Sequence, residues 1–324
     1  MSENEQDKST PAPSEPGWER SVIEKIALAA IEENVKARRW GIVFKSAGFL
    51  YLFIILGIAL FPDFKKDFES DGKEHSAVID VVGIIAEDKG ANADSIIKSL
   101  RKAFKDDNTK GVILHANSPG GSPVQSYYVY EEILKLKKEH PKTPVYAVVG
   151  DICASGCYYL ASASDKIFVS PASLIGSIGV IMDGFGFVDT MQKFGVERRV
   201  LTAGTHKAML DPFSPRKEYE TEFMQQLLDQ VHQQFIKAVK DGRGNRLKDS
   251  PDLFSGLVWT GEESLKLGIA DAYGNDDSVA KDIIGAEKRV DFTEPENVLD
   301  RLAGKLGASF GHTIGSLVDN WAFK

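Results

Sequence analysis

The chain has 324 residues, of which 43% are hydrophobic and 27% charged, and its formal net charge is −8. This length allows one large domain or two small ones, and the composition is ordinary for a globular protein. The negative net charge argues against an extended nucleic-acid surface, because such surfaces carry an excess of Lys and Arg.

The first 62 residues change composition twice. Residues 1–17 are rich in Ser, Pro and Glu, which predicts disorder, and the apolar periodicity from Trp18 to Trp40 predicts an amphipathic helix before or along a membrane. No residue from 46 to 62 is charged, so we expect an N-terminal transmembrane helix over residues 41–62. The alternatives are a buried core helix and a cleaved signal peptide with an unusually long leader.

The charges beside this helix predict its orientation. Its N-terminal flank carries an excess of Lys and Arg, whereas acidic residues dilute the lysines of the other flank. The positive-inside rule then predicts a single-pass protein of the inner membrane, with a cytoplasmic N-terminus and an external, periplasmic C-terminal part. The expected parts are a cytoplasmic tail and helix at 1–40, an anchor at 41–62, a linker at 63–76, a globular domain at 77–289 and an amphipathic tail at 290–324.

Beyond the linker, short apolar runs alternate with helical periodicities. Strands are expected at 77–85, 111–115, 145–149, 166–169 and 198–202, and helices at 93–104, 127–139 and 215–240. A further strand end passes into a helix at Trp259–Ser264. Strands that alternate with helices predict an α/β fold with mainly parallel strands.

Ser155 lies where the strand at 145–149 gives way to an apolar helix. The free N–H groups of a helix start stabilise developing negative charge, which suits a nucleophilic serine, although serine is also a common N-cap. The only two cysteines, Cys153 and Cys157, flank this position and give no zinc pattern. We expect them to be neighbours without a disulfide, because a helix does not readily supply the required geometry.

A glycine pair and three basic side chains are the other candidates for chemistry. In the Pro119–Gly121 turn, glycine lets backbone N–H groups point into a cleft, although Pro-Gly-Gly is also an ordinary turn. Among the histidines, His115 and His206 remain as candidate bases. Lys207 is the alternative, because a neutral, desolvated amine can take a proton from serine, although an isolated lysine is usually a surface residue.

Four segments follow the order of motifs of one known family: residues 117–121, 150–159, 173–180 and 259–261. Over residues 77–285 the chain resembles the bacterial signal peptide peptidase A/protease IV family in its short single-domain form. The resemblance implies a ClpP/crotonase-like spiral fold and a serine peptidase with a Ser–Lys dyad. It implies no cofactor and no metal.

The resemblance also assigns roles to individual residues. By motif, Ser155 matches the nucleophile, Lys207 the general base, and Ser177 the serine that hydrogen-bonds the lysine. Gly121 and Gly156 match the two backbone oxyanion donors. The implied substrates are cleaved signal peptides or other membrane-associated peptides. Longer family members carry the dyad across two repeats, whereas this shorter chain must carry it within one, so a homo-oligomer is implied.

Two other functions stay open at this point. A crotonase-type acyl-CoA enzyme shares the oxyanion glycines, but it needs acidic side chains near the Gly-Gly turn and no serine nucleophile. A catalytically inert membrane scaffold needs neither the acidic side chains nor the serine nucleophile. The apolar periodicity of residues 290–324 is typical of core or oligomer packing, and the alternative is a regulatory tail over a substrate groove.

Overall fold

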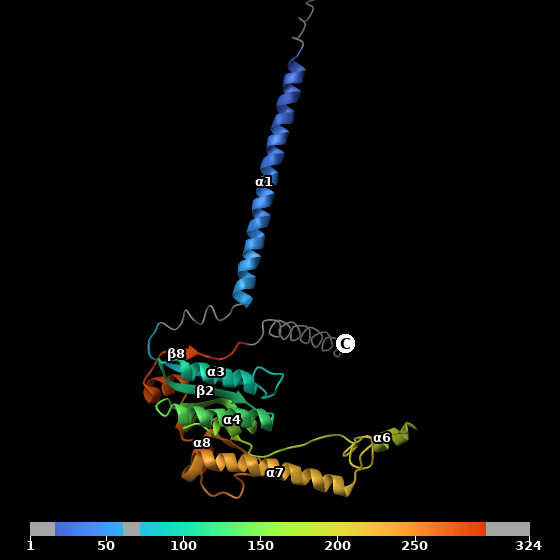
Figure 1. The fold of residues 1–324 in the computed structure, drawn as a ribbon, viewed down its shortest axis with the longest axis vertical. Coiled ribbons are helices and arrows are strands. Elements are labelled where there is room, and N and C mark those ends of the chain that lie inside the picture. The colour runs from blue at the N-terminus through green and yellow to red at the C-terminus, as the bar shows by residue number, and fades with distance from the viewer. Residues whose placement is uncertain (1–16, 61–71, 296–324) are drawn as a thin grey trace, which may run out of the picture. The chain divides into compact units, whose positions relative to one another are not determined.

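The computed structural model describes residues 17–60 and 72–295 (Figure 1). The chain divides into two compact units, residues 1–64 and residues 65–324. The disorder predicted before residue 17 and most of the predicted C-terminal tail, residues 296–324, lie outside the described residues.

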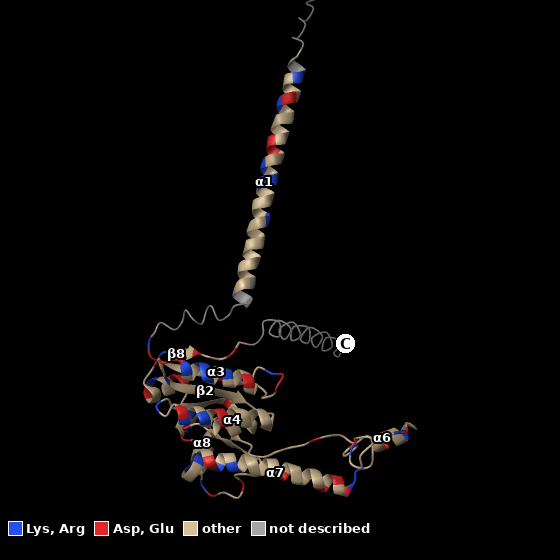
Figure 2. Cartoon of the chain, in the orientation of Figure 1, with Lys and Arg blue, Asp and Glu red and all other residues tan. Residues whose placement is uncertain are grey.

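The first unit contains one continuous helix, α1, which spans Trp18–Leu60 and has 43 residues. Its charged side chains end at Lys45 (Figure 2), and beyond this point Phe49 and Phe53 are 69% and 68% exposed. No helix in the described part of the chain is long and apolar enough to cross a membrane. The transmembrane helix expected at 41–62 therefore finds no support there, and its last two residues lie outside that part.

The second unit is an α/β fold built on a mainly parallel sheet, as predicted. Within residues 72–295 the sheet has eight strands in the order β6-β5-β3-β2-β1-β8, with β4 paired to β3 and β7. Only β5 and β6 pair in antiparallel fashion among these strands. The strands are β1 His75–Val82, β2 Thr109–Ser118, β3 Val145–Ala154, β4 Lys166–Val169, β5 Leu174–Gly176, β6 Val258–Thr260, β7 Ala272–Tyr273 and β8 Arg289–Asp291.

The central strand β3 changes its neighbour along its length. Its first half, at Tyr146–Val148, pairs with β4, and its last residues, Ile152–Ala154, pair with β5. This second pairing extends β3 five residues past the apolar run that predicted it. As a result, Ser155 follows the last residue of a central strand directly.

Helices connect the strands and cover the sheet. They are α3 Ala93–Lys105, α4 Pro123–Glu139, α5 Gly156–Ala161, α6 Val188–Lys193, α7 Glu218–Arg243, α8 Gly261–Leu267 and α9 Asp276–Ser278, with short helical turns at Gly244–Arg246 and Val279–Ile284. Four of them begin at polar N-caps: Asn92, Ser122, Thr260 and Asn275 accept hydrogen bonds from amides three residues later.

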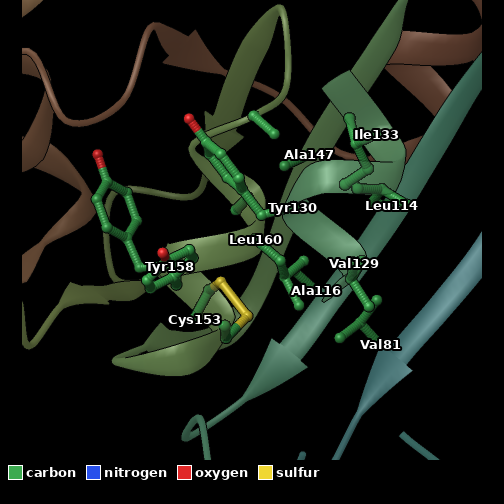
Figure 3. Close-up of a cluster of buried hydrophobic side chains, with 14 of the residues drawn as sticks. Val81, Leu114, Ala116, Val129, Tyr130, Ile133, Ala147, Cys153, Tyr158 and Leu160 are labelled. Atoms are coloured by element: carbon green, nitrogen blue, oxygen red, sulfur yellow. A yellow bond between two sulfur atoms is a disulfide. The ribbon is translucent and has the colours of Figure 1, made fainter. Parts of the chain in front are cut away.

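The main core lies between one face of the sheet and helices α3, α4 and α5. Leu114 of β2, Val129 and Ile133 of α4 and Leu160 of α5 are fully buried together (Figure 3). The alternate residues of the strands face a smaller cluster that includes Ile113. The sheet is thus covered on both faces, as parallel sheets require.

One predicted strand is wrong. Residues 198–202 form no strand, and Leu201 is fully exposed. The β-branched residues of this run have no neighbouring strand to pair with, and a strand forms only where a partner is available. The run belongs instead to an extended segment, residues 180–217, that contains α6 and joins β5 to α7 (Figure 1).

Candidate active site

Ser155 occupies a strained turn between β3 and α5. Its φ of 52° and ψ of −122° lie in a region that non-glycine residues rarely adopt, at a cost of about 1–3 kcal/mol. Its side chain makes no capping hydrogen bond, so the structural N-cap role is not realised. A strained serine on a sharp strand-to-helix turn is the arrangement of a nucleophile elbow.

Two glycines bring backbone amides next to this turn. A β-carbon on Gly120 would lie 2.8 Å from the β-carbon of Ser155, and one on Gly156 would lie 3.2 Å from the amide nitrogen of Gly121. Within residues 72–295 neither the Gly121 nor the Gly156 amide donates a hydrogen bond. Two free N–H groups beside a serine can stabilise an oxyanion.

The glycine turn is itself held in place by a short loop after β1. The Ile85 amide donates to the Gly120 carbonyl at 2.9 Å, and the Ser122 amide donates to the Ile85 carbonyl at 2.8 Å. Gly121 has a φ of 151°, and a β-carbon on it would lie 2.1 Å from the Ile85 carbonyl oxygen. Only glycine fits this position, which explains the Gly-Gly pair physically.

Ser177 lies beside Ser155 across one strand pairing. It follows Gly176, which is paired with Ala154, and the Ser155 amide donates to the Gly176 carbonyl at 2.8 Å. Ser177 has a φ of 51°, and its amide donates to the Leu257 carbonyl at 2.7 Å. The structure thus brings together four of the five predicted site residues: Ser155, Ser177, Gly121 and Gly156.

Lys207 is not brought to this cluster within one chain. It is exposed, and its neighbours tie its segment to the first turn of α7: the His206 and Tyr219 rings lie 5.2 Å apart, and the Leu210 amide donates to Glu220 at 3.1 Å. The same helix contacts the Ser177 loop at His232, whose Nε2 lies 3.0 Å from the Ile178 carbonyl oxygen.

The length of α7 sets the separation. His232 is thirteen residues after Tyr219 in the sequence, which corresponds to about 20 Å of helix at 1.5 Å per residue. A lysine side chain does not span this distance. Figure 1 shows α6 and its adjoining loops at the end of α7 that lies away from α8.

The two candidate histidines lie away from Ser155. His115 is on the opposite face of the sheet, with Nδ1 2.8 Å from the Asp276 carboxylate, which raises the pKa of His115 against the opposing effect of burial. His206 packs on Tyr219 at the start of α7. Neither ring contacts the serine in the described part of the chain.

Cys153 and Cys157 form a disulfide, contrary to the prediction of neighbouring thiols (Figure 3). The prediction assumed that both cysteines lie on one helix, but Cys153 lies near the end of β3 and Cys157 lies near the start of α5. The positive φ of Ser155 turns the chain between them and leaves their α-carbons 5.2 Å apart, within the range that a disulfide needs.

Comparisons with known proteins show what the chain is similar to. The model of peptidase family S49 matches residues 137–290. A protein of Methanocaldococcus jannaschii that carries the name of a protease is 31% identical over 238 residues, which cover 72% of this chain and 74% of that protein. Protease 4 of Haemophilus influenzae is 31% identical over 203 residues, 61% of this chain and 32% of that enzyme.

A second kind of relative is much longer than the matched region. The Na(+)/H(+) antiporter NhaA of Brucella abortus is 44% identical over 200 residues, which cover 62% of this chain. The match spans only 27% of the antiporter's length.

Proposed function

Because this chain belongs to peptidase family S49, the signal peptide peptidase A/protease IV family, and is a serine-type peptidase, we propose that it hydrolyses peptides with Ser155 as the nucleophile and Lys207 as the general base. The observation that carries this proposal is the strained Ser155 turn beside the free amides of Gly121 and Gly156.

The reaction follows from these positions. A neutral lysine amine takes the proton of the Ser155 hydroxyl, and the oxygen attacks the peptide carbonyl. The Gly121 and Gly156 amides stabilise the oxyanion, and the proton passes to the leaving amine. Water then releases the acyl group by the same route in reverse. Ser177, next to Ser155, holds the lysine by a hydrogen bond in this scheme.

We further propose that Lys207 reaches Ser155 from a second copy of the chain. Within one chain the lysine segment contacts the start of α7, about 20 Å along the helix from His232, which contacts the loop after Ser177. The same segment exposes large apolar side chains: Phe185 is 80% exposed, Phe194 79% and Leu201 fully exposed. Exposed apolar groups of this size favour a protein interface, so a homo-oligomer both covers them and completes the dyad.

The forked β3 strand and the parallel sheet support the finer proposal that the fold is a ClpP/crotonase-like spiral. Membrane anchoring through residues 41–62, with the catalytic domain on the periplasmic side of the inner membrane, is also proposed. The uncharged run from residue 46 to 62 supports it, and so does the disulfide, because disulfides persist outside the reducing cytosol. Cleaved signal peptides and other membrane-associated peptides are the proposed substrates.

Three variants test the chemistry. Ser155→Ala and Lys207→Ala should each abolish peptide hydrolysis and leave the fold intact, whereas His206→Ala should retain most of the activity. Circular dichroism and thermal melting provide the control for folding. Activity of Ser155→Ala within about tenfold of the wild type would reject the nucleophile, and an inactive His206→Ala with an active Lys207→Ala would make the base a histidine.

A mixing experiment tests the shared site. Ser155→Ala and Lys207→Ala are each inactive alone, but refolding them together forms sites that pair an intact Ser155 with an intact Lys207. In an equal mixture with random pairing, one site in four has both groups intact, so recovery of about a quarter of wild-type activity is expected. No recovery in mixed oligomers would place the dyad within one chain.

The membrane proposal is tested by protease access in intact spheroplasts. Cleavage within residues 127–240 by protease added outside is expected from the charge asymmetry around the anchor. Protection of this region until the membrane is lysed would contradict the orientation.

A further inference from the structure

The disulfide encloses the nucleophile at the centre of a five-residue loop. Cys153 lies two residues before Ser155 and Cys157 two residues after it. Both cysteines are fully buried in the main core, and they join the end of β3 to the first turn of α5. The covalent bond therefore connects the two segments that the strained turn separates.

The turn needs support, because relaxation of Ser155 to a negative φ would redirect its side chain. Two backbone hydrogen bonds hold the turn: the Ser155 amide to Gly176 at 2.8 Å, and the Tyr159 amide to the Ser155 carbonyl at 2.9 Å. The hydroxyl adds no hydrogen bond of its own to a neighbouring amide. A strained residue persists only where its surroundings over-determine its conformation.

The small size of the loop indicates that the bond acts locally. A disulfide stabilises a fold mainly by restricting the unfolded chain, and this effect grows with the length of the loop that it closes. A loop of five residues is short, so this stabilisation is small compared with that of a disulfide that closes a long loop. The Cys153–Cys157 bond is therefore poorly placed to stabilise the whole domain and well placed to fix one turn.

We infer that the Cys153–Cys157 disulfide is a positioning element that holds Ser155 in its catalytic backbone conformation, opposite the Gly121 and Gly156 amides. This inference rests on the proposed role of Ser155 as the nucleophile. Neither cysteine touches the substrate in this scheme, so both act through the serine that they flank. Loss of the bond lowers the rate of acylation and leaves substrate binding largely unchanged.

Reduction provides one way to remove the bond. A dithiol such as dithiothreitol supplies two electrons and two protons, so that Cys153 and Cys157 become thiols while the reagent closes to its own cyclic disulfide. Because both sulfurs are buried, this exchange requires the turn to open, and reduction should be slow in the folded protein.

The test compares Cys153→Ala, Cys157→Ala and the double variant. If the bond positions Ser155, all three lose kcat by the same factor, about tenfold or more, with KM within about twofold of the wild type. Dithiothreitol then lowers kcat of the wild type to the level of the double variant and has no effect on that variant. Retention of kcat within twofold in the double variant, or single losses that multiply in the double variant, would overturn the inference.

Two further measurements separate positioning from folding and from the proposed function. Amide hydrogen exchange in the double variant should become faster at residues 153–159 and stay unchanged in β1 and β2, with little change in Tm. Unchanged exchange at the turn would overturn the positioning role even if the wild type itself proved inactive. Inactivity of both the wild type and the variants would reject the proposed function, and the exchange data alone would then decide on the disulfide.

Discussion

The Gly121→Ala substitution is the most demanding test of the oxyanion site. The new methyl group would lie 2.1 Å from the Ile85 carbonyl oxygen and 2.9 Å from the Ile85 nitrogen, and both are backbone atoms that cannot rotate away. Ordinary van der Waals contact begins at 3.4 Å, so the Gly121 backbone must move away by about 1 Å or more. Alanine is also strained at the φ of 151° that the turn imposes.

This displacement sets the expected loss of activity. A misplacement of about 1 Å in a catalytic group costs about 100-fold, and removal of one oxyanion donor costs about 100- to 1,000-fold in kcat, or about 2.7–4 kcal/mol of transition-state stabilisation. We therefore expect kcat of Gly121→Ala to fall about 100- to 1,000-fold, while KM changes little because the ground-state carbonyl makes weaker use of the donor.

Steady-state hydrolysis of a fluorogenic peptide measures this loss, and Gly150→Ala is the matched control. Gly150 lies in β3 where the strand changes its neighbour, and its β-carbon would be 3.3 Å from the nearest atom, in the Asn117 side chain, instead of 2.1 Å from a backbone oxygen. The control should stay within a few-fold of the wild type. A folded Gly121→Ala protein with kcat within tenfold of the wild type would refute the oxyanion role.

Three further predictions concern the surrounding structure. Asp271→Ala should lower the free energy of unfolding, measured by urea titration, by about 3–5 kcal/mol. The reason is that the Arg243 side chain, which is 0% exposed and lies 2.7 Å from Asp271, would be left charged without its carboxylate partner. A loss under about 1 kcal/mol would contradict this. Ser177→Ala should lower kcat far more than it raises KM, and an unchanged kcat would make Ser177 structural. Asp276 raises the pKa of His115, so their ion pair should stabilise the fold fully below about pH 6.5, and this stabilisation should be lost as the pH rises through the raised pKa of His115. Measurements of the free energy of unfolding across this pH range should show the loss in the wild type and not in Asp276→Asn.

Local sequence patterns predict those parts of the site that are determined by a few neighbouring residues. The apolar run before Gly150 indicated a buried strand leading to Ser155, and the Gly120–Gly121 pair indicated a turn with accessible amides. Thr260 could be expected as an N-cap because of its position between a strand and a helix. Each of these features depends on a few neighbouring residues, so the sequence was sufficient.

Other features depend on contacts that no local pattern records. The disulfide exists because Ser155 adopts a positive φ, which the packing of β5 and the Gly120 turn impose. Residues 198–202 have the composition of a strand, but no partner strand lies beside them. The separation of Lys207 from Ser155 follows from where α7 meets the core, so motif order alone could not reveal that the two residues lie apart within one chain.

The most direct test of Ser155 as the nucleophile is the site of covalent labelling by a fluorophosphonate. The full chain is labelled in its folded state, reduced and digested with trypsin, and the adduct is mapped by fragment mass spectra. Cleavage after Lys142 and Lys166 gives one peptide, residues 143–166, that contains Ser155. We expect the added mass on Ser155 in the wild type and no adduct in Ser155→Ala. An adduct on another serine, or equal labelling of Ser155→Ala, would contradict the assignment of the nucleophile.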